Sequence, residues 1–326
     1  MIITKTPFRV SFFGGGTDYP EYFETHGGAV LATAVEQSAF VAVSRFYSRL
    51  FDYRIRIAYR EVECVNELDE IRHPAFRECL RHCGISHDVE VSYTAELPSF
   101  SGLGSSSSFI VGLLNGLNAF QGRAVPPLDL AYQAIALERG AMRECVGCQD
   151  QALAAVGGFN VLEFRAIDNI VVHRVPLSRE RLAEFERHLL LLFTGFRRRA
   201  SDIAARQVGR IPQNLEALKL MQRQVDRAYN SLTGNDGLEE FGKLLDEGWR
   251  LKQSLDTGVT NPTIQNYYEE GLAGGAFGGK LLGAGGGGFL LLFVPPERRD
   301  EVRRRLNHLE EIPLAIGAPG SHILHS

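Results

Sequence analysis

A run of small residues directly before an apolar-periodic helix has the composition of an anion-binding loop. Residues 97–108 read LPSFSGLGSSSS, and in residues 109–120 the apolar side chains recur with the period of a helix. Backbone N–H groups of such a turn point outward, and the helix N-terminus adds the positive end of its dipole. The serine hydroxyls offer further hydrogen bonds or an oxygen ligand for Mg²⁺. These residues therefore predict a loop that holds phosphate.

Two further glycine-rich segments lie far from this loop in the sequence. Residues 12–20 read FFGGGTDYP, and residues 283–288 read GAGGGG between two expected strands. The second segment contains a GxGxxG match, but it leads into a strand near the C-terminus instead of the helix that a dinucleotide site requires. Residues 274–280 approach a Walker A loop, but Leu281 stands where a serine or threonine would hold Mg²⁺. We reject both nucleotide motifs.

The late glycine cluster still needs an explanation, because four consecutive glycines are more than a turn requires. Close approach to a ligand or to another stretch of backbone explains them better, and the sequence leaves both open. On the first explanation, Gly285 and Gly286 contact the substrate.

The composition is that of an ordinary soluble chain with room for two domains: 326 residues, 44% hydrophobic and 23% charged. A net charge of −4 gives no global basic field for nucleic acid. The N-terminus lacks a signal-peptide pattern, and no run of about eighteen apolar residues occurs, so we expect no membrane span. Five cysteines, an odd number, favour reduced thiols and a cytoplasmic location. For the CxxC pair Cys145 and Cys148, we favour small residues beside a turn over a redox or zinc centre.

The elements that must position these motifs follow from periodicity. Alternation and β-branched side chains predict strands over 8–13, 40–44, 53–57, 89–93, 159–164, 170–175, 188–194, 279–283, 289–294 and 312–316. Helical periodicity predicts helices over 106–120, 128–142, 149–155, 201–208, 213–232, 238–255, 261–271 and 297–307. Strands dominate the first 100 residues and long helices follow residue 176, which indicates the α+β class with two packed domains, residues 1–180 and 181–326.

Three motifs in order resemble the GHMP kinase superfamily, which includes galactokinase, homoserine kinase, mevalonate kinase and phosphomevalonate kinase. They are the Pro7-x-Arg9-Val10 strand, the Gly-Leu-Gly-Ser-Ser loop at 102–106 and the glycine cluster at 283–288, and together they span nearly the whole chain. The resemblance implies the GHMP kinase fold, in which an N-terminal domain like domain 2 of ribosomal protein S5 precedes a C-terminal ferredoxin-like domain. It also implies an active site between the domains, with ATP and Mg²⁺ as cofactors.

Within the superfamily, residues 12–22 look most like the anomeric sugar kinases, among them D-glycero-D-manno-heptose 7-phosphate kinases and fucokinase domains. Galactokinases carry Gly-Glu-His-Thr-Asp-Tyr at this place, so that Gly15 and Gly16 replace the Glu and His here, while Asp18 and Tyr19 remain. The resemblance implies that this turn contacts the sugar and that Asp18 holds its hydroxyls. The alternative for Asp18 is a simple turn aspartate.

The resemblance also assigns the catalytic pair. Asp150, in the segment VGCQDQ, matches the galactokinase segment that carries the catalytic aspartate, and a carboxylate there can accept the proton of an attacking sugar hydroxyl. Arg9 stands at the family's position for an active-site arginine, where a fixed cation stabilises the transferring charge. The alternatives are a helix N-cap for Asp150 and a solvent-facing side chain for Arg9. We favour function for Arg9 because Phe8, Val10 and Phe12 occupy the other face of its strand.

For the nucleotide, the resemblance implies that Ser106 and Glu138 bind Mg²⁺ together. A hydroxyl and a carboxylate suffice, since Mg²⁺ keeps several waters and takes phosphate oxygens as well. The alternative for Glu138 is a solvated helix glutamate. The phosphates themselves would be held mainly by backbone N–H groups of the loop, at Gly102, Leu103, Gly104, Ser105, Ser106 and Ser107.

A basic run after the predicted strand at 188–194 is a candidate for a phosphate on the substrate. Arg197 and Arg198 precede a predicted helix N-terminus, and this combination is suited to a sugar phosphate. The alternative is a solvated basic run.

The function that the resemblance implies is ATP- and Mg²⁺-dependent phosphorylation of the anomeric hydroxyl of a sugar. The foremost substrate is D-glycero-D-manno-heptose 7-phosphate, which would give the 1,7-bisphosphate for lipopolysaccharide or capsule precursors. The alternatives are another small-molecule kinase of the superfamily, such as a fucose-type enzyme, and a non-catalytic sugar- or ATP-binding regulator. The joint presence of Arg9, Ser106, Glu138 and Asp150 favours an enzyme. We expect a sugar or sugar phosphate as partner, and neither nucleic acid nor membrane; a homodimer is compatible with the sequence.

Overall fold

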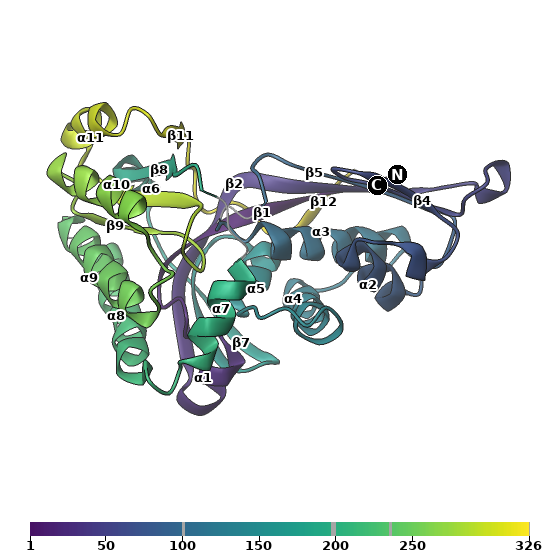
Figure 1. Ribbon diagram of the computed structural model, residues 1–326, viewed down its shortest axis with the longest axis horizontal. Helices are drawn as coiled ribbons and strands as arrows, with labels where there is room; N and C mark the ends of the chain where they lie inside the picture. Colours follow the sequence, from purple (N-terminus) through teal and green to yellow (C-terminus); the bar gives the residue numbers. More distant parts are fainter. Residues whose placement is uncertain (100–101, 197–199, 235–236, 326) are drawn as a thin grey trace.

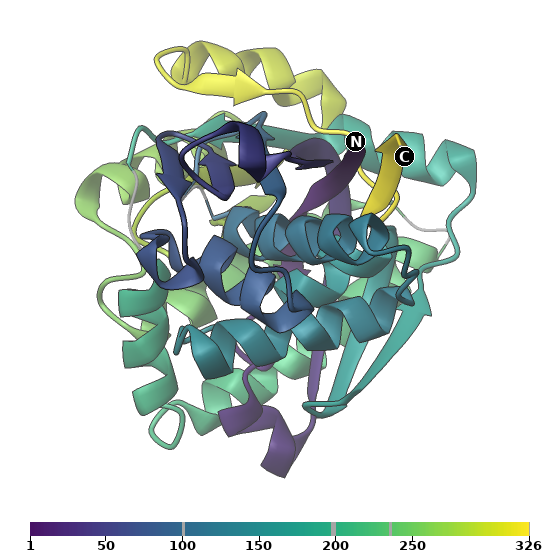
Figure 2. The ribbon, with the colours of Figure 1, turned by 90° about the vertical axis from the view of Figure 1, so that its right-hand side faces the viewer.

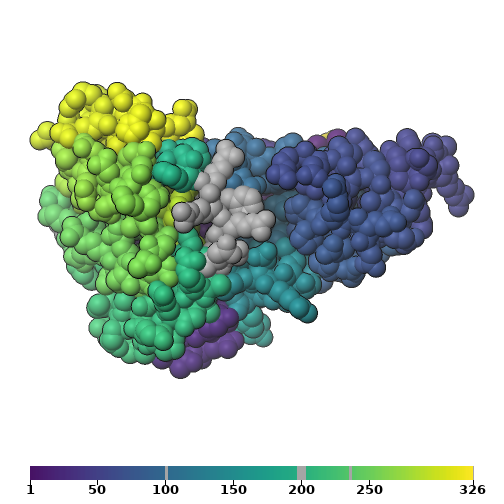
Figure 3. Space-filling view, in the orientation of Figure 1, coloured from purple at the N-terminus to yellow at the C-terminus, as the bar shows by residue number. Residues whose placement is uncertain are grey.

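The computed structural model describes residues 1–99, 102–196, 200–234 and 237–325, and in these ranges the chain forms two lobes (Figure 1). Each lobe consists of a β-sheet with helices packed on it. The space-filling view separates them by colour, with blue and teal for the first lobe and green and yellow for the second (Figure 3). None of the helices in the described ranges is both long and apolar enough to span a bilayer.

The sheet of the first lobe is organised by one long strand. Its described strands run in the order β12-β1-β2-β5-β3-β4, and β6 and β7 are added beside β2. The 18 residues of β2 pair with β1 along most of their length, with β6 at one end and with β5 at the other. The strand bounds are β1 (Ile2–Phe13), β2 (Gly28–Arg45), β3 (Ile55–Ala58), β4 (Val62–Val65), β5 (Val89–Ala95), β6 (Phe159–Ala166), β7 (Asn169–Arg174) and β12 (His322–His325).

Helices cover one face of this sheet, and α3 lies directly against β1 and β2. Two glycines permit the close approach: a Cβ added to Gly112 would lie 2.6 Å from Thr6 Oγ1, and one added to Gly116 would lie 3.2 Å from Val43 Cγ2. The helix that begins at the predicted phosphate loop is therefore fixed on the strand that carries Arg9. The bounds are α1 (Pro20–His26), α2 (Pro74–Cys83), α3 (Ser105–Phe120), α4 (Pro127–Ala136), the π-helical turn η3 (Leu137–Ala141), α5 (Gln149–Val156), and the 3₁₀ turns η1 (Ser48–Leu50) and η2 (Leu68–Glu70).

The second lobe contains an antiparallel sheet whose described strands run in the order β11-β8-β10-β9. Its strands are β8 (Leu189–Phe193), β9 (Gly278–Leu281), β10 (Phe289–Phe293) and β11 (Glu310–Ile312). Its helices are α6 (Arg179–His188), α7 (Ala200–Gly209), α8 (Leu215–Thr233), α9 (Glu239–Leu255), α10 (Pro262–Ala273), η4 (Pro296–Arg298) and α11 (Arg299–Arg305).

A shared aromatic core joins the lobes. The ring of Phe12 on β1 lies 5.5 Å from that of Phe185 and 5.7 Å from that of Phe241, centroid to centroid, and Phe185 lies 5.3 Å from Phe293. All four rings are buried, and burial of side chains of this size dominates the energetics of such a contact. The C-terminal end of β1 is thereby held between the lobes.

The alternation along β1 decides where its polar residues lie. Phe8, Val10 and Phe12 belong to the shared core, so the intervening Arg9 and Ser11 face the helices of the first lobe. This is the arrangement on which the functional interpretation of Arg9 depended.

The end of the chain returns to the first lobe. β12 pairs antiparallel with β1, and Ser321 contacts Thr6 Oγ1 through its hydroxyl (2.8 Å) and the carbonyl oxygen of Ala154 through its N–H (2.8 Å). Figure 2 shows the two chain ends side by side at this edge of the sheet. Division of the chain at residue 180 thus describes the two lobes up to β11 but not the last residues, which pack on the sheet of the first lobe. The strand expected over 312–316 lies earlier, as β11 at Glu310–Ile312, and shares only residue 312 with the prediction; β12 was not expected at all.

Candidate active site

Arg9 and Asp150 form a two-pronged ion pair where β1 meets the start of α5. Arg9 Nε and Nη2 donate to Asp150 Oδ1 and Oδ2, each at 2.7 Å, and Arg9 Nη1 donates to the carbonyl oxygen of Gly102 at 2.6 Å. The Arg9 side chain is 7% exposed, whereas that of Asp150 is 25% exposed, so the carboxylate is oriented by a buried cation and stays open to solvent on one side. The structure therefore brings both predicted catalytic residues together, beside the predicted phosphate loop.

The phosphate loop meets Asp150 at its last glycine. Gly104 precedes α3 with φ +74°, and a Cβ there would lie 3.2 Å from Asp150 Oδ2 and 3.2 Å from Arg9 Cγ, so that a larger residue would be both strained and crowded. No side chain caps α3, which leaves the N–H groups of its first turn without that partner. Residues 100 and 101 of the predicted loop lie outside the described residues.

The serine whose side chain bonds directly to Glu138 is Ser107, whereas the shared Mg²⁺ site predicted for Ser106 and Glu138 stays a prediction. Ser107 Oγ donates to Glu138 Oε1 at 3.0 Å, whereas the side chain of Ser106 is exposed. The reason is the helix itself, because adjacent residues point about 100° apart around its axis and cannot share one contact. Ser106 lies in the first turn of α3, where its exposed side chain could contact a bound phosphate.

Glu138 is a buried carboxylate with neutral partners. It lies in the π-helical turn η3, is 1% exposed, and accepts hydrogen bonds from Ser107 and from Gln151 Nε2. No basic side chain of the described residues forms an ion pair with it. Burial raises its pKa to about 8, helped by Asp150 and opposed by the two hydrogen bonds.

This environment fits a divalent cation. A buried carboxylate without a counter-charge is costly, and Mg²⁺ beside Glu138 would supply that charge. In the described part of the chain no three acidic, histidine or cysteine side chains are grouped to hold a metal, so a cation here would take few ligands from the protein. That is the usual situation for Mg²⁺ bound with nucleotide phosphates.

Asp18 anchors the first glycine turn to α5. Its carboxylate accepts the N–H of Gly16 at 3.0 Å and that of Gln149 at 3.5 Å, and it is 2% exposed. Burial, together with the charge of Asp150, raises the pKa of Asp18 above the ordinary value.

The cysteine pair belongs to the same junction. The N–H of Cys148 donates to the Asp18 carbonyl oxygen at 2.9 Å, and both cysteines are free thiols. The turn is thus fixed beside Asp150, as the prediction for the substrate side requires.

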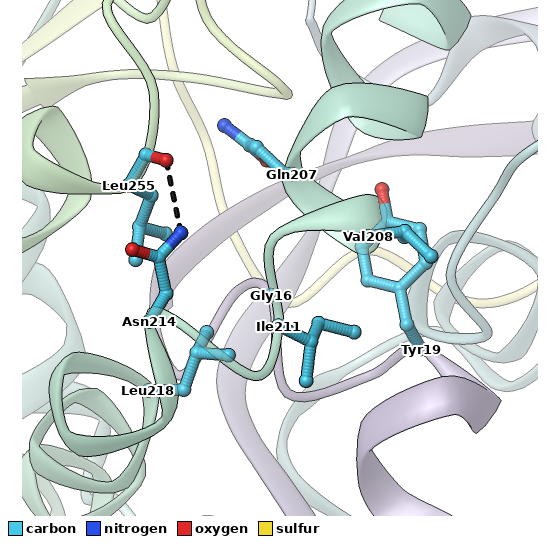
Figure 4. Close-up of a pocket in the computed structure, with 8 residues that line it drawn as sticks. All are labelled: Gly16, Tyr19, Gln207, Val208, Ile211, Asn214, Leu218 and Leu255. Carbon is cyan, nitrogen blue, oxygen red and sulfur yellow. Dashed lines mark hydrogen bonds between the residues drawn. The ribbon is translucent and has the colours of Figure 1, made fainter.

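The other side of this turn is an apolar wall. A small pocket of about 10 Å³ lies there between the turn and helices α7 and α8 (Figure 4). Its lining residues are Gly16, Tyr19, Gln207, Val208, Ile211, Asn214, Leu218 and Leu255. Asn214 Nδ2 already donates to the Leu255 carbonyl oxygen at 2.9 Å, and burial raises the pKa of Tyr19 well above its usual range, which keeps the phenol neutral. This pocket is too small for a sugar or a phosphate, so its apolar lining serves to pack the turn against α7 and α8.

The late glycine cluster packs against backbone, and the contact of Gly285 and Gly286 with the substrate stays a prediction. Both are buried; the Gly286 N–H donates to the Val259 carbonyl oxygen at 2.8 Å, and a Cβ at Gly285 would lie 2.7 Å from Val259 Cα. A Cβ at Gly283 would lie 2.6 Å from Gly102 Cα. Of the two explanations that the sequence left open, contact between two stretches of backbone therefore applies. The predicted phosphate ligands Arg197 and Arg198 lie outside the described residues.

Two buried lysines lie on the second lobe's side of the site, and the sequence analysis did not single them out. Lys252 of α9 donates from Nζ to the carbonyl oxygens of Leu281, at 3.0 Å, and Gly283. Lys280 of β9 donates from Nζ to the carbonyl oxygen of Phe12 at 2.8 Å. These bonds fix the positions of the glycine cluster and of the end of β1. The phosphate loop packs against both segments.

The charge of these lysines is only partly balanced. Burial lowers the pKa of Lys280 to about 7, with Arg9 acting in the same direction and Asp18 against it. Burial, followed by Lys280 and Arg9, lowers the pKa of Lys252 well below its usual range. A usable signal did exist in the sequence, because Lys252 interrupts the apolar stripe of its helix three residues after the buried Trp249.

Replacement of Lys280 by methionine is expected to change how stability depends on pH. Between pH 7 and about 10 the unfolded chain binds a proton at this position and the folded protein does not. The wild-type free energy of unfolding should therefore rise with pH relative to Lys280→Met, approaching about 1.4 kcal/mol per pH unit. Chemical unfolding at pH 7, 8 and 9 measures the difference, and Lys219→Met, on the exposed face of α8, should follow wild type. Parallel pH profiles for all three proteins would contradict the assignment.

Comparison with known proteins gives a consistent family. The GHMP kinases N terminal domain matches residues 70–158, and the GHMP kinases C terminal domain matches residues 212–311. D-glycero-alpha-D-manno-heptose 7-phosphate kinase of Campylobacter jejuni is 28% identical over 87% of this chain and 86% of its own length. L-fucokinase/L-fucose-1-P guanylyltransferase of Bacteroides fragilis is 27% identical over 80% of this chain, which spans only 31% of that larger protein.

Solved structures share the fold from end to end. The structure described as a D-glycero-D-manno-heptose 1-phosphate kinase from Bacteroides thetaiotaomicron superposes with a TM-score of 0.82 at 23% identity, covering 100% of this chain and 99% of that one. Galactokinase of Lactococcus lactis, complexed with galactose, superposes with a TM-score of 0.75 at 18% identity, covering 98% and 94%. The predicted two-domain α+β fold is confirmed. Since both family domains match in order on this shared fold, the chain belongs to the GHMP kinases, enzymes that transfer a phosphoryl group from ATP.

Proposed function

We propose that this kinase phosphorylates the anomeric hydroxyl of a sugar, with D-glycero-D-manno-heptose 7-phosphate as substrate and the 1,7-bisphosphate as product. The relative from Campylobacter jejuni, similar over most of both chains, is named for a heptose 7-phosphate. The first glycine turn supports a substrate other than galactose, because Gly15 and Gly16 stand where galactokinases carry charged or imidazole side chains.

The observation that carries the chemistry is the Asp150 carboxylate, held in place by Arg9 and open to solvent beside the phosphate loop. The sugar hydroxyl oxygen forms a bond to the γ-phosphorus while the bond to the ADP oxygen breaks, and Asp150 accepts the hydroxyl proton. Arg9 orients the carboxylate and adds positive charge where negative charge moves during transfer.

The residues for the cofactors follow from the same geometry. Backbone N–H groups at the start of α3 would hold the phosphates of ATP, and Glu138 with the Ser106 hydroxyl would hold Mg²⁺. When bound, Mg²⁺ neutralises charge on the phosphate oxygens. Glu138 orients the cation, and Gln151 and Ser107 orient Glu138.

ADP release across a panel of acceptors tests the substrate. The panel contains the heptose 7-phosphate, unphosphorylated heptose, mannose, L-fucose and galactose, and ³¹P NMR of the product locates the new phosphate. We expect the highest kcat/KM for the heptose 7-phosphate, with the phosphate at the anomeric carbon. Preference for L-fucose would favour the fucose-type alternative, which the Bacteroides fragilis relative supports. Sugar binding without turnover on any acceptor would favour a regulator.

A further inference from the structure

The three glycines of the first turn are not equivalent. Gly14 has φ +78°, and a Cβ there would lie 1.9 Å from the Ala29 carbonyl oxygen; Gly16 has φ +101°. Backbone geometry therefore requires glycine at both. Gly15 has neither constraint, since an added Cβ would meet its nearest neighbours, Ser11 Oγ and Gln149 Nε2, at 3.7 and 3.8 Å. Because these are ordinary contact distances, the absence of a side chain at Gly15 leaves a space that the fold does not need.

The two side chains that border this space carry unused polar atoms. Ser11 is 7% exposed and Gln149 is 8% exposed, and neither Ser11 Oγ nor Gln149 Oε1 has a hydrogen-bond partner among the described residues. The amide nitrogen end of Gln149 is engaged, since the Gln149 side chain hydrogen-bonds the Asp18 carboxylate. Buried polar atoms that stay unpaired cost about 1–3 kcal/mol each, so Ser11 Oγ at the edge of this space and Gln149 Oε1, at the other end of the amide whose nitrogen borders it, point to a ligand.

The space lies alongside the reacting groups. Ser11 is two residues after Arg9 on β1 and so shares its face of the strand, and Gln149 directly precedes Asp150 at the start of α5, which packs on β1. A ligand atom at Gly15 would therefore contact the same two elements, β1 and α5, that carry Arg9 and Asp150.

We propose that Gly15, Ser11 and Gln149 form the subsite for the sugar hydroxyl on the carbon adjacent to the anomeric one. This hydroxyl enters the space at Gly15, donates its hydrogen bond to Gln149 Oε1 and accepts one from the Ser11 hydroxyl, so that a single OH group satisfies both buried atoms. The inference rests on the proposed function and sharpens it: the enzyme selects sugars that retain the 2-hydroxyl and rejects 2-deoxy sugars. Discrimination of this kind is strong because the analogue leaves both protein atoms unpaired.

Kinetics of protein variants against a substrate analogue test the subsite. Wild type, Ser11→Ala and Gly15→Ala are compared on D-glycero-D-manno-heptose 7-phosphate and on its 2-deoxy analogue. With the natural sugar, each variant should lose about 10-fold or more in kcat/KM, with KM for ATP unchanged. With the 2-deoxy analogue, Ser11→Ala should equal wild type, and Gly15→Ala should lose less than it does with the natural sugar, because its methyl group occupies space that the missing hydroxyl leaves. Equal fold losses on both sugars would overturn the proposal.

Thermal unfolding separates this role from a structural one. Ser11→Ala removes an unpaired buried hydroxyl, so the Tm of the ligand-free protein should not fall. The matched control is Gly237→Ala, since Gly237 is exposed and an added Cβ meets no atom within 4 Å. It should match wild type in every assay. A fall in Tm for Ser11→Ala together with equal losses on both sugars would assign Ser11 to packing.

The proposed substrate and the proposed subsite can be disproved independently. If wild type prefers another sugar in the acceptor panel, the proposed substrate is wrong, and the same comparison is made with that sugar and its 2-deoxy form. The subsite is overturned only if the variants then lose equally on both.

Discussion

Replacement of Asp150 by asparagine is expected to lower kcat by about 10²–10⁴-fold and to leave the affinity for ATP nearly unchanged. The amide keeps the size of the carboxylate and can still meet Arg9, but it cannot accept the proton of the attacking hydroxyl. Asp150 is also placed against Gly104 of the phosphate loop without occupying the N–H groups of α3, so nucleotide binding should survive. Steady-state turnover and calorimetric titration with a non-hydrolysable ATP analogue measure the two effects.

The control for this prediction is Asp168→Asn, an exposed aspartate in the turn between β6 and β7, which should behave as wild type. Turnover of Asp150→Asn within tenfold of wild type would exclude a proton-accepting role. Arg9 would then be left as the main protein group acting on the transferring charge.

Replacement of Glu138 by glutamine should act in opposite directions on activity and stability. Loss of a ligand that orients Mg²⁺ should lower turnover by about 10²-fold or more and raise the Mg²⁺ concentration needed for half-maximal rate, because metal stabilisation of charge is worth several kcal/mol. In the ligand-free protein the pKa of about 8 keeps Glu138 mostly protonated at pH 7, so the same change removes a buried charge, whose partners Ser107 and Gln151 are neutral, only above about pH 8. The Tm without Mg²⁺ should therefore stay the same or rise.

Glu24→Gln is a matched control, because Glu24 is exposed on α1. It should change neither quantity. A large fall in Tm for Glu138→Gln would show that the carboxylate is a structural element, and unchanged Mg²⁺ dependence would remove it from the metal site.

Local patterns were sufficient where one element carries the information. The alternation of Phe8, Val10 and Phe12 placed Arg9 on the opposite face of its strand, and the structure has Arg9 there, bonded to Asp150. The helix after the phosphate loop was expected to start at 106 and starts at Ser105. In both cases a single period, two for a strand and about 3.6 for a helix, determines which side chains share a face.

Contacts between elements explain what the sequence left undetermined. Which serine bonds to Glu138 depends on how α3 is rotated against η3, and no pattern within either segment records that rotation. Glycine at 285 and 286 looks alike in sequence whether a ligand or the backbone of Val259 approaches it. Lys280 bonds to Phe12, 268 residues away in the chain, and the sequence around it shows only a lysine between glycine and leucine.

The return of β12 to the sheet of the first lobe has a consequence for how the molecule is made. A nascent chain contains both Arg9 and Asp150 long before residue 322 leaves the ribosome. The N–H and C=O groups of β1 that pair with β12 therefore stay unpaired while the whole second lobe is synthesised. Pairings between such distant segments form late and slowly. A first lobe expressed alone would therefore carry an unpaired edge at residues 3–5 of β1, the strand that also carries Arg9.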